Sequence, residues 1–251
     1  MKLPNSSAEP EFKDSERLLD YNRYATQFDR MCQITPVYQD NIELLLKFLP
    51  TFNLPENATI CDLGAGTGNF ILAMARVLSL AKYIHLDFDE AMNNHAKAKY
   101  ENAGLENVEV QQEHIQRAQF EESSLDLVVC VNALNTAAPQ LPVLKLIRSW
   151  LKPTGSLFLL DFGREQRVVD WTWYIVKHLY QTEGIGEVFR SFWMNREAIR
   201  QNRRARLDQK AGRMWTHSTE EFSDLVEKAG FQVNHVQTCY RDYGDLVVAQ
   251  K

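Results

Sequence analysis

A glycine-rich turn between residues 59 and 69 limits the fold of this chain more than any other feature. The segment reads Thr59-Ile60-Cys61-Asp62-Leu63-Gly64-Ala65-Gly66-Thr67-Gly68-Asn69. Glycines at alternate positions let a strand turn sharply into a helix, and they let a ligand lie against the main chain. The dinucleotide pattern G-x-G-x-x-G would need a third glycine at position 69, which is Asn. Because Asp62 repels a pyrophosphate and attracts an ammonium, the turn favours a ligand with a cationic end.

A second acid ends the next apolar segment. Tyr83-Ile84-His85-Leu86-Asp87 finishes in a carboxylate 25 residues after Asp62. In nucleotide-binding α/β folds an acid at this place accepts hydrogen bonds from ribose hydroxyls. The ordered set resembles the class I S-adenosylmethionine (SAM)-dependent methyltransferases, over about residues 20 to 160 and again in the tail. The resemblance implies SAM as cofactor and S-adenosylhomocysteine as product.

The resemblance also implies the cofactor contacts, residue by residue. They are Asp62, Gly64, Gly66 and Gly68 in the turn, Asp87 on the ribose, Phe88 beside the adenine, Ile115 on the purine ring, Asn132 near the methyl donor, and Tyr24 in the N-terminal helix. His114 stands where many family members carry an Asp facing the adenine amino group. Either His114, its neighbour Glu113 or a backbone group makes that contact.

The fold class follows from the alternation of strands and helices between residues 59 and 161. This pattern predicts a parallel sheet covered on both faces, an α/β fold. The resemblance extends it to a Rossmann-like, mostly parallel seven-stranded sheet whose last two strands form an antiparallel hairpin. The predicted division is a helical N-terminal cap (1–50), the SAM-binding core (51–161), a helical lid inserted after strand five (162–217), and a C-terminal helix and hairpin (218–251). Ser218-Thr219-Glu220-Glu221 predicts a capping box at the start of that last helix.

The insertion holds four of the five tryptophans, at positions 171, 173, 193 and 215. A segment that follows strand five emerges at the carboxyl ends of the strands, where ligands bind in open α/β sheets. We therefore predict that it chooses the acceptor, with Tyr21, Tyr38, Trp173, Trp193 and Arg203 as the substrate-facing residues. Two alternatives stay open: the tryptophans can instead be buried against the sheet, and Tyr21, Tyr24 and Phe28 can simply be the apolar face of their helix. The arginines between 196 and 213 favour a solvated face; turned inward, they would select an acidic acceptor.

The predicted reaction is methyl transfer to a small-molecule acceptor by in-line displacement, for which positioning supplies much of the acceleration. A base is needed only for a protonated acceptor, and spacing does not choose among His178, Tyr38 and Tyr240. No catalytic residue is therefore assigned. The stretch Asn132-Ala133-Leu134-Asn135 lacks the N-P-P-Y signature of amide and base N-methyltransferases, which disfavours such acceptors.

Two other functions remain as alternatives. Arg203, Lys228-Ala229-Gly230-Phe231 and Cys239-Tyr240 are similar to carboxy-SAM synthases, although Gly66 stands where that family is expected to have a serine. A SAM-binding protein without catalytic activity is the other alternative, and the intact turn with both acids gives no sign of it.

Composition limits the partners. The net charge of −5 argues against a nucleic acid as the main partner. Four scattered cysteines show no metal-ligand spacing, so no metal is expected. No run of about eighteen apolar residues is present, which indicates a cytoplasmic protein without a membrane span. The acceptor's identity and the oligomeric state cannot be inferred from these features.

Overall fold

The computed structural model describes residues 21–165, 167–194, 203, 206–212 and 214–251, and the helices, strands and contacts of the described fold lie within these residues. The helices are α1 (Tyr21–Ile34), α2 (Pro36–Phe48), α3 (Asn69–Ala75), α4 (Glu90–Asn102), α5 (Gln140–Trp150), α6 (Val168–Glu183), α7 (Ile185–Met194) and α9 (Thr219–Lys228). The strands are β1 (Thr59–Leu63), β2 (Lys82–Asp87), β3 (Val108–Gln112), β4 (Leu125–Val131), β5 (Leu151–Phe162), β6 (Gln232–Cys239) and β7 (Gly244–Gln250). Short 3-10 helices lie at Leu49–Phe52 and Leu134–Thr136.

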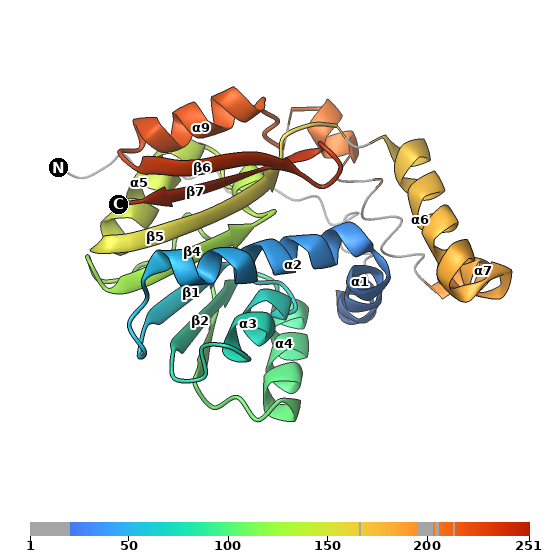
Figure 1. The fold of residues 1–251 in the computed structure, drawn as a ribbon, viewed down its shortest axis with the longest axis horizontal. Coiled ribbons are helices and arrows are strands. Elements are labelled where there is room, and N and C mark those ends of the chain that lie inside the picture. Colours follow the sequence, from blue (N-terminus) through green and yellow to red (C-terminus); the bar gives the residue numbers. More distant parts are fainter. Residues whose placement is uncertain (1–20, 166, 195–202, 204–205, 213) are drawn as a thin grey trace.

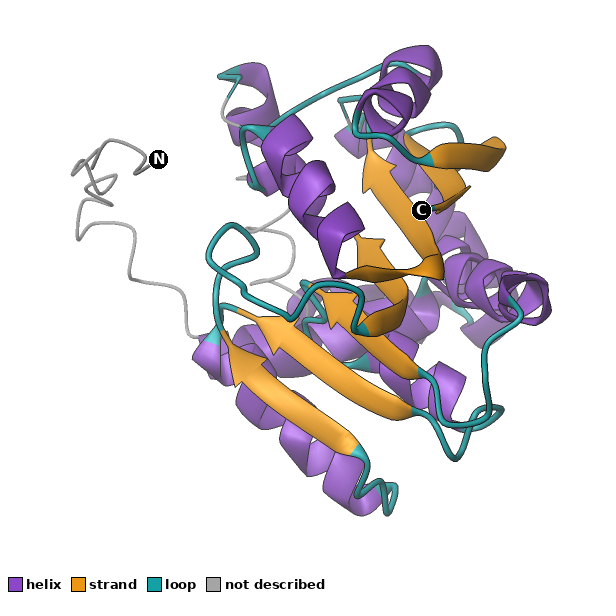
Figure 2. Cartoon of the chain, turned by 90° about the vertical axis from the view of Figure 1, so that its left-hand side faces the viewer, coloured by secondary structure: helices purple, strands orange, loops and turns teal. Residues whose placement is uncertain are grey.

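The strands form one seven-stranded sheet in the order β3-β2-β1-β4-β5-β7-β6. The first five strands pair in parallel, whereas β7 runs antiparallel to both β5 and β6. Figure 2 shows the strands as one twisted layer with helices on both sides. The predicted fold class, including the antiparallel hairpin, is confirmed.

Two hydrophobic clusters hold the helices on the sheet, one on each face. The first joins α2, α3 and α4 to side chains such as Ile60 and Phe158, and the second joins α5 and α9 to side chains such as Cys61 and Leu159. Neighbouring residues of one strand enter opposite clusters, as the period of two in a strand requires. Cys61 and Cys130 are fully buried and pack as small side chains in the second cluster.

Local sequence signals account for several element ends. Asp89 caps α4 by accepting a hydrogen bond from the Met92 amide at 2.8 Å, and Ser218 and Glu221 form the expected capping box of α9. Helix α2 ends at Phe48, after which Pro50 lies within a 3-10 turn rather than directly after the helix.

The N-terminal helix and the insertion lie at the same end of the molecule. In Figure 1, α1, α6 and α7 stand beyond the end of the sheet at which β5 ends. This is the end at which the other parallel strands also finish, because they run in the same direction as β5. The insertion therefore begins where a ligand would bind in an open α/β sheet. Its role as a lid, and the division of the chain into four parts, stay predictions.

Candidate functional site

The three glycines of the turn have different structural roles. All three have positive φ: 74° at Gly64, 55° at Gly66 and 78° at Gly68. A Cβ at Gly64 would lie 2.3 Å from the Cβ of Ala133, and one at Gly68 would lie 2.1 Å from the Tyr100 hydroxyl. A Cβ at Gly66 would meet nothing within 4 Å. Gly64 and Gly68 therefore permit close packing inside the protein, while Gly66 borders open space.

Asp62 is buried beneath this turn with one oxygen unpaired. The side chain is 1% exposed, and its Oδ2 atom has no hydrogen-bond partner. Burial, and then the charge of Asp87, raise the pKa of Asp62 to about 8. An isolated buried carboxylate is costly, so a cationic ligand would supply the partner that this structure lacks.

Asp87 holds the turn as well as facing the site. Its Oδ2 accepts a hydrogen bond from the Gly66 amide at 2.9 Å, and its Oδ1 accepts one from the Asp89 amide at 2.9 Å. Burial raises the pKa of Asp87, although these two amides oppose the rise. Since a carboxylate offers about four acceptor positions, both oxygens keep capacity for further donors.

Phe88 and His114, two residues predicted to lie near the adenine, are in contact with each other. Their rings stack with centroids 4.8 Å apart and planes 9° apart, and Phe88 is 57% exposed. Glu113 accepts a hydrogen bond from the His114 amide at 2.8 Å. Ile115 is buried, and its Cδ1 lies 3.8 Å from the Cβ position of Gly64. The turn, Ile115 and the stacked pair are thus neighbours, but the choice between His114 and Glu113 stays open.

Asn132 lies at the end of β4 in a left-handed conformation, with φ of 56°. Its Nδ2 donates to the Tyr240 hydroxyl at 2.8 Å, and its buried Oδ1 has no partner. Burial raises the pKa of both Tyr240 and Tyr38 above that of an ordinary phenol. Both phenols therefore keep their protons at neutral pH and act there as hydrogen-bonding groups rather than as bases.

An acid that the sequence analysis did not single out connects α1 to the turn and to α4. Asp29 accepts hydrogen bonds from the Thr67 hydroxyl, from Asn69 Nδ2 at 3.1 Å and from Lys99 Nζ at 2.7 Å. The His95 ring lies 2.9 Å from the same carboxylate. Burial would raise the pKa of Asp29, but these partners, Lys99 first, hold it below its usual range. No local pattern marks Asp29, because its partners lie 38 to 70 residues away.

His85 is a buried core residue within β2. Its two ring nitrogens lie 2.8 Å from the Tyr100 hydroxyl and 2.9 Å from Asn93 Oδ1. Burial lowers its pKa to about 4, so the ring is neutral at physiological pH.

The residues predicted to face the acceptor do not all lie near the glycine turn. Tyr38 packs edge-on against Phe70, and its hydroxyl accepts from Asn69 Nδ2 at 3.3 Å, which brings it next to the turn. Trp173 is 68% exposed, and Arg203 is also exposed. The side chains of Tyr21, Tyr24 and Trp193 lie outside the described residues, as do the arginines at 196, 200, 204 and 213.

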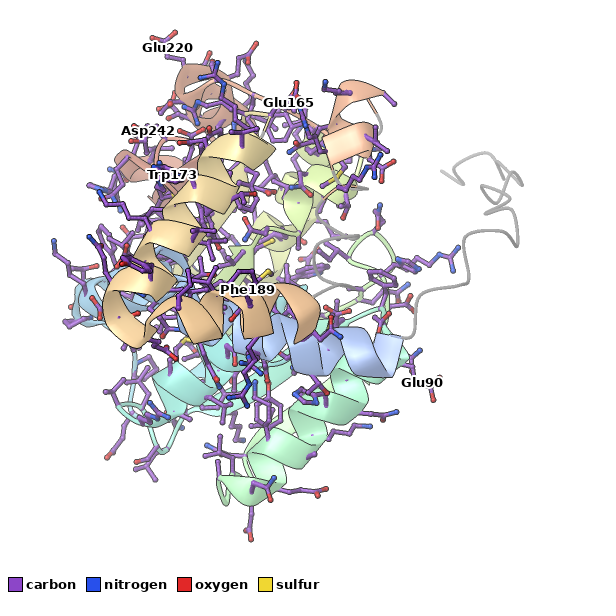
Figure 3. All side chains as sticks on the ribbon, turned by 90° about the vertical axis from the view of Figure 1, so that its right-hand side faces the viewer. Glu90, Glu165, Trp173, Phe189, Glu220 and Asp242 are labelled. Carbon is purple, nitrogen blue, oxygen red and sulfur yellow. The ribbon has the colours of Figure 1, made fainter. Side chains whose placement is uncertain are left out.

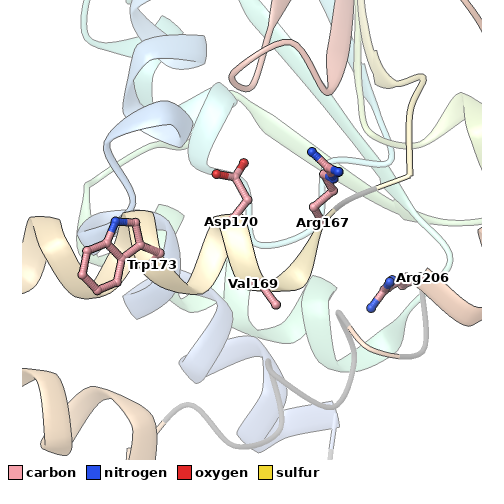
Figure 4. A pocket seen from close by; sticks show the side chains of 5 residues that line it. All are labelled: Arg167, Val169, Asp170, Trp173 and Arg206. Carbon is pink, nitrogen blue, oxygen red and sulfur yellow. The ribbon is translucent and has the colours of Figure 1, made fainter.

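Within the insertion, Trp171 rather than Trp173 packs against the body of the protein. Its ring lies 5.7 Å from that of Tyr243, and the Arg241 guanidinium covers both Trp171 and Tyr174. Trp173 instead borders a shallow, open hollow of about 600 Å³ that is also lined by Arg167, Val169, Asp170 and Arg206 (Figure 4). This hollow does not include any residue of the glycine turn.

Among the described residues, no cluster of three or more His, Cys, Asp or Glu could hold a metal ion. None of the described helices is long and apolar enough to span a membrane.

Comparison with known proteins identifies the family. Residues 54–229 match the model of the methyltransferase domain, which covers more than half of the chain. The chain is 29% identical over 142 residues to a demethylmenaquinone methyltransferase of Lactococcus lactis, covering 56% of this chain and 56% of that protein. It is 36% identical over 83 residues to a carboxy-SAM synthase of Campylobacter jejuni, covering 33% of this chain and 35% of that protein. The chain thus spans little more than half the length of the demethylmenaquinone methyltransferase and about a third of the length of the carboxy-SAM synthase.

The crystal structure of a SAM-dependent methyltransferase from Aquifex aeolicus shares the fold, with a TM-score of 0.55, 22% identity, and coverage of 81% of this chain and 87% of that one. The glycine turn, the two strand-end acids and the first five strands of the sheet described above all lie within the residues that match the family model. The chain therefore belongs to the methyltransferase-domain family, the class I SAM-dependent methyltransferases, whose cofactor is S-adenosylmethionine.

Proposed function

We propose that this protein transfers a methyl group from SAM to a small-molecule acceptor by in-line displacement. The observation that carries the proposal is the unpaired Oδ2 of Asp62, buried beneath a turn in which Gly66 borders open space. A buried carboxyl oxygen without a partner, in the strand that leads into this turn, fits a ligand with a cationic end. Family membership names the ligand class, and the relatives named as methyltransferases support the reaction.

The residues present fit SAM. Asp62 would hold the ammonium group, the open side of Gly66 would accept the amino-acid portion, and Asp87 would accept hydrogen bonds from the ribose. Phe88, His114 and Ile115 would border the adenine, and the unpaired Oδ1 of Asn132 would lie near the methyl donor. Tyr24 stays assigned to the cofactor by resemblance alone.

SAM, when bound, supplies a methyl group on a sulfonium, whose leaving group is a neutral thioether. The work left to the protein is to hold the acceptor's lone pair in line with that bond and to exclude water. Tyr38 and Tyr240, two of the three candidate bases, hold their protons at neutral pH and so do not act as bases there. An acceptor that arrives already deprotonated, or a neutral amine whose product ammonium loses its proton to water, needs no such base.

Calorimetry and a transfer assay test the proposal together. Wild-type protein should bind SAM and S-adenosylhomocysteine, and labelled methyl from SAM should appear in at least one compound of a small-molecule extract. Failure to bind SAM overturns the proposal. Binding without transfer to any fraction of the extract would instead favour the non-catalytic alternative.

A carboxy-SAM synthase is the second candidate, favoured by the 36% identity to the Campylobacter enzyme. Mass spectrometry of the nucleoside product separates the two functions. A methyltransferase releases S-adenosylhomocysteine, whereas a synthase of this kind leaves a carboxylated SAM. The exposed Arg203 gives no additional support to the second candidate, because no described contact links it to the turn.

The proposal also includes the kind of partner and the cellular location. The acidic net charge supports a small molecule rather than a nucleic acid as the partner. The four scattered cysteines without metal-ligand or C-x-x-C spacing support a reducing compartment such as the cytoplasm.

A further inference from the structure

Helix α6 carries apolar side chains on two sides, and only one side is covered. On the covered side, Trp171 packs against both Tyr174 and Tyr243, and Leu179 is 1% exposed. On the other side, Val169, Trp173 and Tyr180 are 83%, 68% and 60% exposed. Positions 169, 173 and 180 fall within one narrow stripe of a helix, because they are four and seven residues apart. A surface helix needs only one apolar stripe to pack on its own domain. The second stripe of α6 is not packed against any part of the described fold.

Helix α7 continues this exposed surface. Ile185 and Phe189, one helical turn apart, are 60% and 72% exposed, while Val188 is buried. Figure 3 views the molecule from the side on which α6 and α7 stand and shows Trp173 and Phe189 on the near face. We call the set Val169, Trp173, Tyr180, Ile185 and Phe189 the outer apolar surface.

The charge of this part of the chain is opposite to that of the rest. Residues 162–217 contain 11 of the 28 Lys and Arg but only 6 of the 33 Asp and Glu, so they carry a net charge of +5. The other residues therefore carry −10, which gives the total of −5. Among the exposed side chains of the insertion are Arg167, Lys177, Arg203 and Lys210. Apolar and aromatic side chains flanked by basic ones in an acidic protein are typical of a helix that lies in the interface of an anionic membrane.

The hollow beside the outer apolar surface combines the same two chemistries. Arg167 and Arg206 line it together with Val169 and Trp173 (Figure 4). Arg206 also pairs with Glu165 at 3.0 Å, and Asp170, the one acid of the lining, pairs with Arg241 at 3.1 Å. A phosphate with an attached apolar chain fits such a lining, because guanidinium groups bind phosphate and the apolar side chains accept hydrocarbon.

We propose that α6 and α7 dock on the surface of an anionic phospholipid bilayer, with the outer apolar surface inserted among the lipids and the basic residues at the headgroups. Tyr180 and Trp173 suit this position, since amphipathic aromatic rings concentrate at membrane interfaces. A second copy of the chain fits less well, because two insertions of charge +5 would repel each other. This docking is independent of the proposed methyl transfer, and its test uses no SAM.

The test is flotation of the full chain with vesicles, either of phosphatidylcholine alone or of an equal mixture of phosphatidylcholine and phosphatidylglycerol. Wild-type protein should bind the anionic vesicles at least about tenfold more strongly, and added salt should weaken this binding. Trp173→Glu combined with Phe189→Glu should lower the binding roughly tenfold or more, because both side chains leave the hydrocarbon boundary. Lys177→Glu should lower it about fivefold or more through charge alone.

The matched control is Val77→Glu combined with Leu80→Glu. These two apolar residues follow α3 and are each 61% exposed, but they lie outside the insertion. The control should bind anionic vesicles like the wild type. Circular dichroism should show every variant folded, since all replaced side chains are exposed, and Val169→Asp serves as a second variant if the double substitution fails to fold.

Three outcomes overturn the proposal: equal binding to both kinds of vesicle, equal loss in the control, or no binding by the wild type. A wild-type dimer in gel filtration that the Trp173→Glu and Phe189→Glu substitutions dissociate would assign the surface to a second copy instead.

Discussion

Asp62 and Asp87 lie at the ends of neighbouring parallel strands, and the charge of Asp87 adds to burial in raising the pKa of Asp62 to about 8. Asp87 has two backbone amides to offset its own burial, whereas one oxygen of Asp62 has no partner. The two carboxylates therefore differ in what they need from a ligand. Asp62 needs a positive charge, while Asp87 needs only additional hydrogen-bond donors.

This difference predicts the effect of Asp62→Asn on cofactor affinity. Loss of a charge-assisted contact costs about 1.5 to 3 kcal/mol, so SAM should bind roughly ten- to a hundredfold more weakly by calorimetry. Asp126→Asn is the matched control, because Asp126 is also a buried strand carboxylate but pairs with Lys152 and the Thr59 amide. Its affinity for SAM should equal that of the wild type. Unchanged SAM affinity in Asp62→Asn would remove the ammonium assignment.

The same substitution should stabilise the SAM-free protein. The pKa of Asp62 is raised from 3.8 to about 8 on folding, so the folded state keeps a proton that the unfolded state releases between these values. Wild-type stability should therefore fall as pH rises from about 4 to about 8, with a contribution of at most about 4 kcal/mol at pH 7. The amide introduced by Asp62→Asn cannot titrate, so thermal unfolding of this variant should depend less on pH in this window and give a higher Tm at pH 7. A lower Tm at pH 7 would show that the carboxylate is stabilised by a partner.

Gly66→Val should abolish SAM binding while the domain stays folded. A side chain at position 66 meets no protein atom within 4 Å, so it would occupy the space left for the ligand. The left-handed φ makes valine strained there, at a cost of about 1 to 3 kcal/mol. Gly104→Val is the control, since Gly104 has a φ of 68° and equally open surroundings outside the turn. Both variants should lose similar stability, but only Gly66→Val should lose SAM binding; if it binds SAM normally, the cofactor lies elsewhere.

Asp29→Ala should loosen the glycine turn. It removes the acceptor of Thr67, Asn69 and Lys99, and it leaves the ammonium of Lys99 without its carboxylate. We expect a loss of about 1 to 3 kcal/mol in the free energy of unfolding, faster amide exchange at residues 64–69, and weaker SAM binding. A double-mutant cycle with Lys99→Ala should give a coupling of about 0.5 kcal/mol or more. Additive effects would show that α1 and α4 are not linked through this pair.

The parts of the site that the sequence predicted are those that local chemistry determines. The turn was recognisable because positive φ angles at 64, 66 and 68 can be adopted comfortably only by glycine. Asp87 was predictable because it ends an apolar strand 25 residues after Asp62. The capping box at Ser218 is likewise a short local pattern.

Other parts depend on contacts between distant residues. Asp29 and Lys99 are 70 residues apart, and neither lies in a pattern that suggests the other. Trp171 and Trp173 are two residues apart on a helix that has apolar side chains on both sides. The spacing of apolar residues therefore does not determine which of the two faces inward. The structure turns Trp171 inward and leaves Trp173 exposed, which makes Trp171 the more direct choice for a mutation that alters the interior of the insertion.

The hydrogen bond from Asn132 to Tyr240 spans 108 residues and joins the end of β4 to the hairpin of β6 and β7. This contact must wait until residues near 240 have been synthesised. The hairpin of β6 and β7 must also pair with β5, through β7, before this contact can form. During synthesis, the glycine turn can form early while the opposite wall of the site is still missing. A nascent chain should therefore acquire its full affinity for the cofactor only at the last step of folding, which makes cofactor binding a measure of completed assembly and not only of a formed loop.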